Sequence, residues 1–252
     1  MDVSKQRTLA GERTLEGVGV HSGEAASLTM KPSEAGGIRF RRVDLDGSPE
    51  IPANLEHVVG TDLGTSLGAG DATVLTVEHV MAALGVAGID HAVLDLSGGE
   101  PPILDGSFLS YFDAVSEVGT VELDRPADVV SIRKAVTVTV PSGASYVATP
   151  ASTFRISATI DFEHRDIGRQ FGSFEVNEDS FRREIASART FGFHEQAEEL
   201  KARGLAQGAS LDNTIVLDEN GIMNEGLRFS DEFLRHKVGD LIGDLALIGG
   251  RL

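Results

Sequence analysis

Apolar residues recur with a helical period near the end of the sequence, between residues 230 and 247. Successive apolar positions are three or four residues apart, which places them on one buried stripe of an α-helix. The stripe consists of Leu234, Val238, Leu241, Leu245 and Ile248. Ser230 is a suitable N-cap, and Asp231 and Glu232 follow in the first turn, where the helix dipole favours carboxylates. The pattern predicts a helix that begins at Ser230 and ends at Leu247.

Two polar residues of this helix, His236 and Asp240, are four positions apart and therefore share one face, which points away from the apolar stripe. Most such pairs are solvent-exposed and contribute little to stability. The same pair could also supply two of the three protein ligands that a catalytic zinc ion requires. The helix alone does not decide between these interpretations, and the second one needs a third ligand.

A helix is also predicted after Thr76, which can cap it, and Gly85 ends it. Its apolar stripe consists of Val77, Val80, Met81 and Leu84. Glu78 and His79 lie off this stripe. His79 is the best candidate for the third ligand, because the preceding glutamate can act as general base toward a metal-activated water molecule. Spacing alone makes this a weak signal.

Other patterns in the first half predict strands, turns and one more helix. Two β-like runs within residues 25–43 flank a turn that contains proline and glycine, and they predict a hairpin. Residues 91–97 predict a strand. For residues 105–107, Asp-Gly-Ser, a turn followed by a serine cap is favoured over a functional site, with a helix from Phe108 to about Val118.

The segment 119–130 combines charge and a proline without a helical period, and it is the predicted boundary between two domains. The domains are residues 1–122 and residues 127–252. The second half is predicted to contain several strands, then helices, with a strand between the last two helices. The predicted strands are 135–140, 145–148, 154–161 and 170–176. The halves are both mixed in helix and strand, but their sequences are too dissimilar to predict a repeat.

The amino-acid composition excludes some classes of function and some kinds of metal site. The chain of 252 residues carries 22 basic and 39 acidic residues, and its net charge of −17 argues against nucleic-acid binding. It contains no cysteine, so a metal site must use histidine, aspartate or glutamate. No apolar segment resembles a signal peptide or a membrane span. We therefore expect a cytoplasmic protein that binds no nucleic acid.

Six runs of the sequence, in order, resemble one enzyme family over nearly the whole chain. They are TVEHVMAALGVAGIDHAVLDL, PPILDGSF, IDFEH, SARTFGF, GLAQGASLDNTIVL and LRFSDEFLRHKVGDLIGDL. Together they closely resemble the zinc-dependent UDP-3-O-acyl-N-acetylglucosamine deacetylases of lipid A biosynthesis. The resemblance implies an α+β fold of two similar domains, each a β-sheet layered on helices, with the active site between them.

The resemblance also implies a role for particular residues. His79, His236 and Asp240 would be the zinc ligands, and Glu78 would be the general base. Lys237 would contact the substrate diphosphate or the developing charge. Thr190 would hydrogen-bond the tetrahedral intermediate, and Phe191 would pack against the sugar. Gly208 would border the passage for the acyl chain. Asp244 would act as an orienting residue.

The implied reaction is hydrolysis of the substrate acetamide with release of acetate, by a monomer that can transiently contact the inner-membrane surface. In the family, Asp244 orients a general-acid histidine in a further strand and helix, but no histidine follows His236 here. We therefore expect metal binding with slow turnover, since general acids contribute about 10²- to 10⁴-fold. The alternative is a weakly active or inactive form that only binds the UDP-sugar or its acyl chain.

Overall fold

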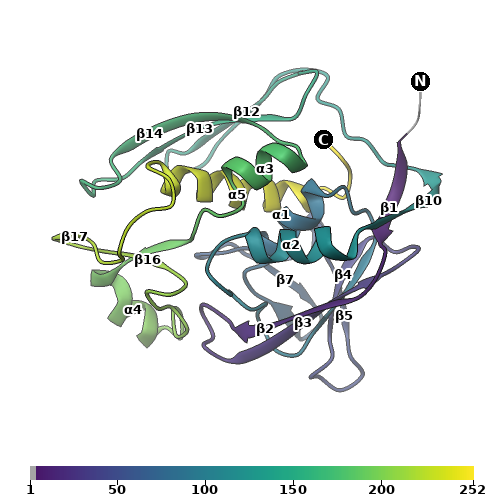
Figure 1. Ribbon diagram of the computed structural model, residues 1–252, viewed down its shortest axis with the longest axis horizontal. Helices are drawn as coiled ribbons and strands as arrows, with labels where there is room; N and C mark the ends of the chain where they lie inside the picture. The colour runs from purple at the N-terminus through teal and green to yellow at the C-terminus, as the bar shows by residue number, and fades with distance from the viewer. Residues whose placement is uncertain (1–3) are drawn as a thin grey trace.

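The structure, a computed structural model, describes residues 4–252 and shows a mixed fold of helices and several small sheets (Figure 1). Residues 1–3, the start of the stretch predicted to lack a signal peptide, lie outside the described residues. None of the helices in residues 4–252 is long and apolar enough to cross a membrane. The prediction of a mixed helix-and-strand fold is confirmed, whereas the division at residues 122 and 127 stays a prediction.

The helices and strands follow one another as in Figure 1. The α-helices are α1 (Glu78–Val86), α2 (Leu109–Val118), α3 (Glu178–Glu184), α4 (Ala197–Ala202) and α5 (Glu232–Ala246). The strands of the first half are β1 (Lys5–Leu9), β2 (Arg13–Val18), β3 (Ala25–Pro32), β4 (Ile38–Arg42), β5 (Glu50–Pro52), β6 (Val58–Gly60), β7 (Ser66–Ala69), β8 (Ala72–Val74) and β9 (Ala92–Leu96). Those that follow are β10 (Thr120–Pro126), β11 (Val136–Thr139), β12 (Ser145–Ala148), β13 (Arg155–Asp161), β14 (Arg169–Glu175), β15 (Phe191–Phe193), β16 (Ile215–Asp218) and β17 (Gly221–Ile222).

The largest sheet has five strands in the order β2-β3-β9-β4-β5. The predicted hairpin between β3 and β4 is wrong, because β9 lies between them, antiparallel to β3 and parallel to β4. All five residues of β9 are buried, which explains its place at the centre of the sheet. The pairing of distant segments outweighs the local turn signal between β3 and β4.

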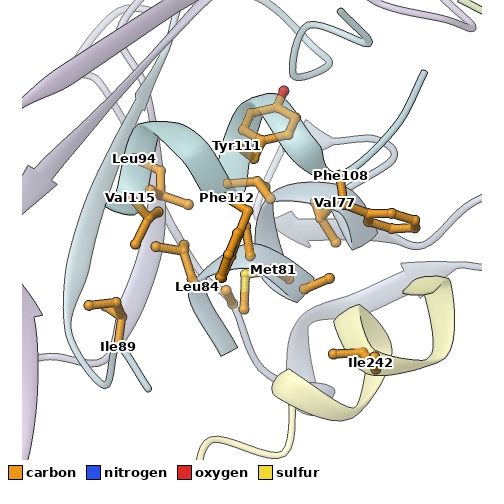
Figure 2. Packing of buried hydrophobic residues seen from close by; sticks show 14 of the residues in the cluster. Val77, Met81, Leu84, Ile89, Leu94, Phe108, Tyr111, Phe112, Val115 and Ile242 are labelled. Carbon is orange, nitrogen blue, oxygen red and sulfur yellow. The ribbon is translucent and has the colours of Figure 1, made fainter. Parts of the chain in front are cut away.

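Helices α1, α2 and α5 form the core between this sheet and the strands of the second half (Figure 1). Met81 and Leu84 of α1 pack with Phe112 of α2 and Leu94 of β9, and Ile242 of α5 approaches the same cluster (Figure 2). The predicted stripe of α1 is buried, as expected. The core therefore joins α1, from the first half, to α5, from the second.

Two glycines allow α1 and α5 to approach closely. A Cβ atom on Gly243 would lie 2.2 Å from the backbone oxygen of Glu78, and one on Gly239 would lie 2.3 Å from the ring of Phe108. A side chain at Gly243 would push α5 away from α1, and one at Gly239 would collide with the ring of Phe108, the residue before α2. The close contact is what brings the polar residues of the two helices together.

The sheets of the second half are small. β13 and β14 form an antiparallel pair that packs on α5, whereas β11 and β12 form a separate hairpin whose residues are all exposed. β16 pairs with β15 and β17. The predicted boundary segment contains β10, which pairs with β1, so it closes onto the first half of the molecule.

The helix ends differ from the predictions. Thr76 does not cap α1: Val77 occupies the N-cap position, and the hydroxyl of Thr76 donates a hydrogen bond to Glu100 (2.7 Å). Helix α1 continues through Gly85 to Val86. α5 begins at Glu232 rather than Ser230. In both helices the first turn is held by tertiary contacts of carboxylates, which a cap pattern does not reveal.

Candidate metal centre

The two closely packed helices each supply part of one polar group. His79 is the second residue of α1, while His236 and Asp240 lie one turn apart on α5. The face of α5 that carries His236 was expected to point away from the core, but both histidines are buried. They are buried because α1 packs on α5, Phe108 lies against both imidazoles, and the carbonyl of Ala188 contacts His236.

The distances within this group suit a metal ion. The ligand atoms of His79, His236 and Asp240 all lie within 4.8 Å of one another. Asp240 Oδ1 is 3.4 Å from His236 Nε2 and 3.8 Å from His79 Nε2. Ligand atoms bound to a tetrahedral zinc ion are about 3.3–3.6 Å apart. Two imidazoles and one carboxylate at these separations therefore fit a zinc ion with small side-chain shifts.

The two histidines are oriented by their surroundings. Nδ1 of His236 is 3.0 Å from the carbonyl oxygen of Ala188, which accepts its proton and leaves Nε2 free to face Asp240. The ring of Phe108 packs against both imidazoles, with centroids 4.5 Å from His79 and 5.0 Å from His236. This contact restricts rotation of the rings.

Burial sets the protonation of the ligands. Burial, followed by the neighbouring His236, lowers the pKa of His79 to about 3. The pKa of His236 is also lowered, mainly by burial. Burial alone would raise the pKa of Asp240, but His236 and Lys237 lower it more. At neutral pH the group therefore holds two neutral imidazoles and a carboxylate, the forms that bind metal ions.

Glu78 begins α1 beside this group and is buried. Its Oε1 accepts a hydrogen bond from the backbone N–H of Thr65 (2.5 Å), but its Oε2 has no partner among the described residues. Burial, followed by the charge of Asp240, raises the pKa of Glu78 to about 8. A buried carboxyl with one free oxygen and a raised pKa is typical of a general base.

Thr65 also joins Glu78 to Asp244. Its hydroxyl donates a hydrogen bond to Oδ1 of Asp244 (2.6 Å) while its N–H holds Glu78. Burial raises the pKa of Asp244. No sequence pattern pointed to Thr65, because its contacts involve residues in two distant helices.

Lys237 follows His236 on α5, and its side chain is half exposed. Its Nζ donates a hydrogen bond to Asp240 Oδ2 (2.9 Å), and the charge of Asp240 raises the pKa of Lys237. A cation therefore stands at the exposed side of the group, where an anionic ligand can reach it.

The other predicted residues lie on two loops and a short strand. Thr190 precedes β15, and its backbone N–H donates to the carbonyl oxygen of Gly106 (2.8 Å). Phe191, in β15, packs edge-on against Phe233, and its ring centroid is 6.4 Å from that of His236. Both residues are half-buried.

Gly208 lies in a loop that packs against the turn after β2. A Cβ atom on Gly208 would lie 2.2 Å from the carbonyl oxygen of Gly19. That turn is held by Glu100, which accepts hydrogen bonds from the backbone N–H groups of His21 and Ser22. Gly208 thus has a packing role that explains the glycine.

A cavity of about 480 Å³ lies apart from this group, beyond the far end of α5. Its walls include Phe154, Val176, Ile242 and Leu245, but not His79, His236 or Asp240. The turn interpretation of residues 105–107 is supported, because Asp105 accepts hydrogen bonds from Ser107.

Comparison with known proteins identifies the family. The family model LpxC, described as UDP-3-O-acyl N-acetylglycosamine deacetylase, matches residues 6–252. Proteins named UDP-3-O-acyl-N-acetylglucosamine deacetylase are similar over almost the whole chain. The relative from Geobacter sp. is 44% identical over 98% of this chain and 81% of its own length. Those from Thermosynechococcus vestitus and Myxococcus xanthus are 46% and 48% identical over 97% of this chain and 85% and 78% of their own lengths. The chain belongs to the LpxC family of UDP-3-O-acyl N-acetylglycosamine deacetylases.

Proposed function

We propose that this protein is a zinc-dependent amidohydrolase that removes the acetyl group of UDP-3-O-acyl-N-acetylglucosamine in lipid A biosynthesis. The observation that carries the proposal is the convergence of His79, His236 and Asp240 beside Glu78, in a chain whose relatives bear the name of that deacetylase. The intact general base favours an enzyme over a binding module, since binding alone does not require it.

His79, His236 and Asp240 would hold the metal ion. A zinc ion held there supplies Lewis acidity, which makes a water molecule more acidic and polarises a carbonyl group. His236 keeps Nε2 available because Nδ1 donates to Ala188. His79 turns its own Nε2 toward the same carboxylate, 3.8 Å from Asp240 Oδ1.

Glu78 takes the proton of the attacking water on its free oxygen, Oε2. Its other oxygen stays bound to the N–H of Thr65, so the carboxylate is oriented throughout. Burial raises the pKa of Glu78 in the metal-free chain, and a cation held beside it would lower that pKa toward neutral pH, where a general base works best. The charge that develops on the acetamide oxygen is stabilised by the hydroxyl of Thr190.

Substrate recognition draws on the residues around this group. Lys237 provides the cation for the diphosphate, and the aromatic face of Phe191 packs against the sugar. The loop that contains Gly208 would border the passage for the acyl chain. Asp244, which already accepts a hydrogen bond from Thr65, would orient the group that protonates the leaving amine.

Acetate release from purified UDP-3-O-acyl-N-acetylglucosamine tests the proposal directly. The zinc-loaded chain is compared with the Glu78→Gln variant, which keeps the shape of the side chain but removes the base. Release by the wild type that the variant lacks supports the enzyme. Substrate binding without any release by the wild type would contradict it and support the binding module.

A further inference from the structure

Glu232 is the most completely buried carboxylate near the metal site, yet none of the catalytic steps uses it. It is the first residue of α5, its side chain is 0% exposed, and it forms an ion pair with Arg189 at 2.9 Å. A buried charge of this kind is costly unless its contacts are complete. Its contacts show what it holds in place.

Both oxygens of Glu232 accept two hydrogen bonds each. Oε1 accepts from the backbone N–H of Arg189 (2.9 Å) and from its Nε (2.9 Å). Oε2 accepts from Nη2 of Arg189 (3.3 Å) and from the backbone N–H of Arg228 (2.5 Å). The carboxylate is therefore saturated with donors and fixed in one orientation.

One of these donors belongs to the peptide unit that also holds a proposed zinc ligand. The carbonyl oxygen of this unit, on Ala188, accepts the Nδ1 proton of His236 (3.0 Å), and its N–H, on Arg189, donates to Glu232. Glu232 and His236 are one turn apart on the same face of α5, so both side chains reach the same peptide. The chain of contacts runs from carboxylate to peptide to imidazole.

A carboxylate at the N–H end of a peptide draws its proton and increases the negative charge on its carbonyl oxygen. Hydrogen bonds linked in this way strengthen one another in a low-dielectric interior. The Ala188 oxygen then holds the Nδ1 proton of His236 more firmly, and the lone pair of Nε2 becomes a stronger ligand for a metal ion. Carboxylates that contact a ligating histidine directly have the same effect.

We propose that Glu232 is a positioning residue of the metal centre, which orients His236 and increases its affinity for zinc through the Ala188–Arg189 peptide. The inference rests on the proposed metal site and extends it to a residue outside the ligand set. Glu232 does not touch the metal, the substrate or the reacting atoms.

The test is the zinc affinity of the metal-free 252-residue chain, measured by competition with a chromophoric chelator, together with the absorption spectrum of the cobalt(II)-substituted protein. Glu232→Gln removes the charge while keeping the shape. Asp231→Asn is the matched control, because it removes the neighbouring carboxylate, which pairs with Arg235 and not with the peptide. We expect Glu232→Gln to weaken zinc binding about 10-fold and to shift the cobalt bands, with both unchanged in Asp231→Asn.

If Glu232→Gln only destabilised the fold, a variant that remained almost fully folded would bind zinc with the affinity of the wild type. Circular dichroism therefore accompanies each titration. If Glu232→Gln does not fold, Glu232→Asp replaces it: this variant keeps the charge but is one methylene too short to hold the peptide as before, and weaker zinc binding is again expected.

Two results would overturn the inference in distinguishable ways. A folded Glu232 variant with wild-type zinc affinity and an unchanged cobalt spectrum would contradict the role of Glu232 while leaving the metal site intact. A wild-type chain that binds no zinc would overturn the metal site itself, and the role of Glu232 with it.

Discussion

Glu78 at the start of α1 and Glu232 at the start of α5 are both buried carboxylates, but their hydrogen bonding is opposite. Glu232 accepts four hydrogen bonds and neutralises an arginine. Glu78 accepts one at Oε1 and leaves Oε2 without a partner among the described residues. It also faces the negative charge of Asp240, which helps to raise its pKa.

The difference separates a carboxylate that holds the structure from one that is available for chemistry. A saturated carboxylate stabilises the fold but has no capacity left to accept a proton in a reaction. A carboxyl that is buried and unsatisfied costs stability, and it is retained where the reaction uses its free oxygen. Replacing each glutamate should therefore have opposite consequences for stability and for turnover.

The largest expected effect is on turnover. In Glu78→Gln, kcat should fall by about 10²- to 10⁴-fold, because the general base is lost while the three ligand residues remain. Acetate release measured at saturating substrate gives the rate, and metal analysis of the same sample shows whether the site is intact. A variant that kept both its metal and its full rate would show that another group removes the proton.

The next largest effect is on the fold. In Glu232→Ala, the free energy of unfolding should fall by about 3–5 kcal/mol, because Arg189 and the two backbone N–H groups are left without their acceptor. Urea unfolding followed by circular dichroism measures it. A loss below about 1 kcal/mol would mean that water replaces the carboxylate, and that the network is not essential to the fold.

Glu78→Gln should also stabilise the metal-free protein, by up to about 4 kcal/mol at pH 8. The folded state raises the pKa of Glu78 from 4.5 to about 8, so between these values it binds a proton that the unfolded chain has released. Wild-type stability therefore falls as pH rises through this window, and the glutamine variant lacks that loss. Thermal unfolding across the range checks it, and curves that stay parallel would contradict the shift.

The smallest effect is expected at the exposed edge of the Glu232 network. Arg228 donates to Asp105 Oδ2 (2.8 Å), and both side chains are about one-third exposed (36% and 35%). Asp105→Asn should lower the free energy of unfolding by about 0.5 kcal/mol and leave turnover unchanged. Burial by itself raises the pKa of Asp105, but its hydrogen bonds to Ser107 and Arg228 lower the pKa overall. The stabilisation from this ion pair is therefore lost only in acid, as pH falls through the lowered pKa of Asp105. If Asp105→Asn lowered the free energy of unfolding as much as Glu232→Ala does, solvent exposure would not be weakening the ion pair between Asp105 and Arg228.

The sequence predicted that helices α1 and α5 exist, but it did not predict how they pack against the rest of the molecule. Apolar periodicity identified the buried stripe of α1, whereas only Leu234 and Val238 of the stripe predicted for α5 are fully buried. It also assigned His236 to a polar outer face. It could not show that Gly243 lets α1 pack on that side, or that Gly239 leaves room there for Phe108. The convergence of His79 with Asp240 was implied by the resemblance to a family rather than by spacing.

What the sequence could not indicate depends on contacts between distant segments. The insertion of β9 between β3 and β4 is one example, since the local turn signal favoured a hairpin. Thr65 and Glu232 are others: nothing near them in the sequence shows that one binds Glu78 and the other a peptide that holds His236. Their functions follow from packing between helices.

The central claim is that α1 and α5 together form a metal site, and metal content per chain tests it most directly. The purified chain is loaded with zinc, freed of excess metal and compared with the His79→Ala, His236→Ala double variant, with circular dichroism to confirm that both are folded. We predict about one zinc ion per wild-type chain and none in the variant. A folded wild-type chain without zinc, or a variant that binds as much as the wild type, would contradict the account.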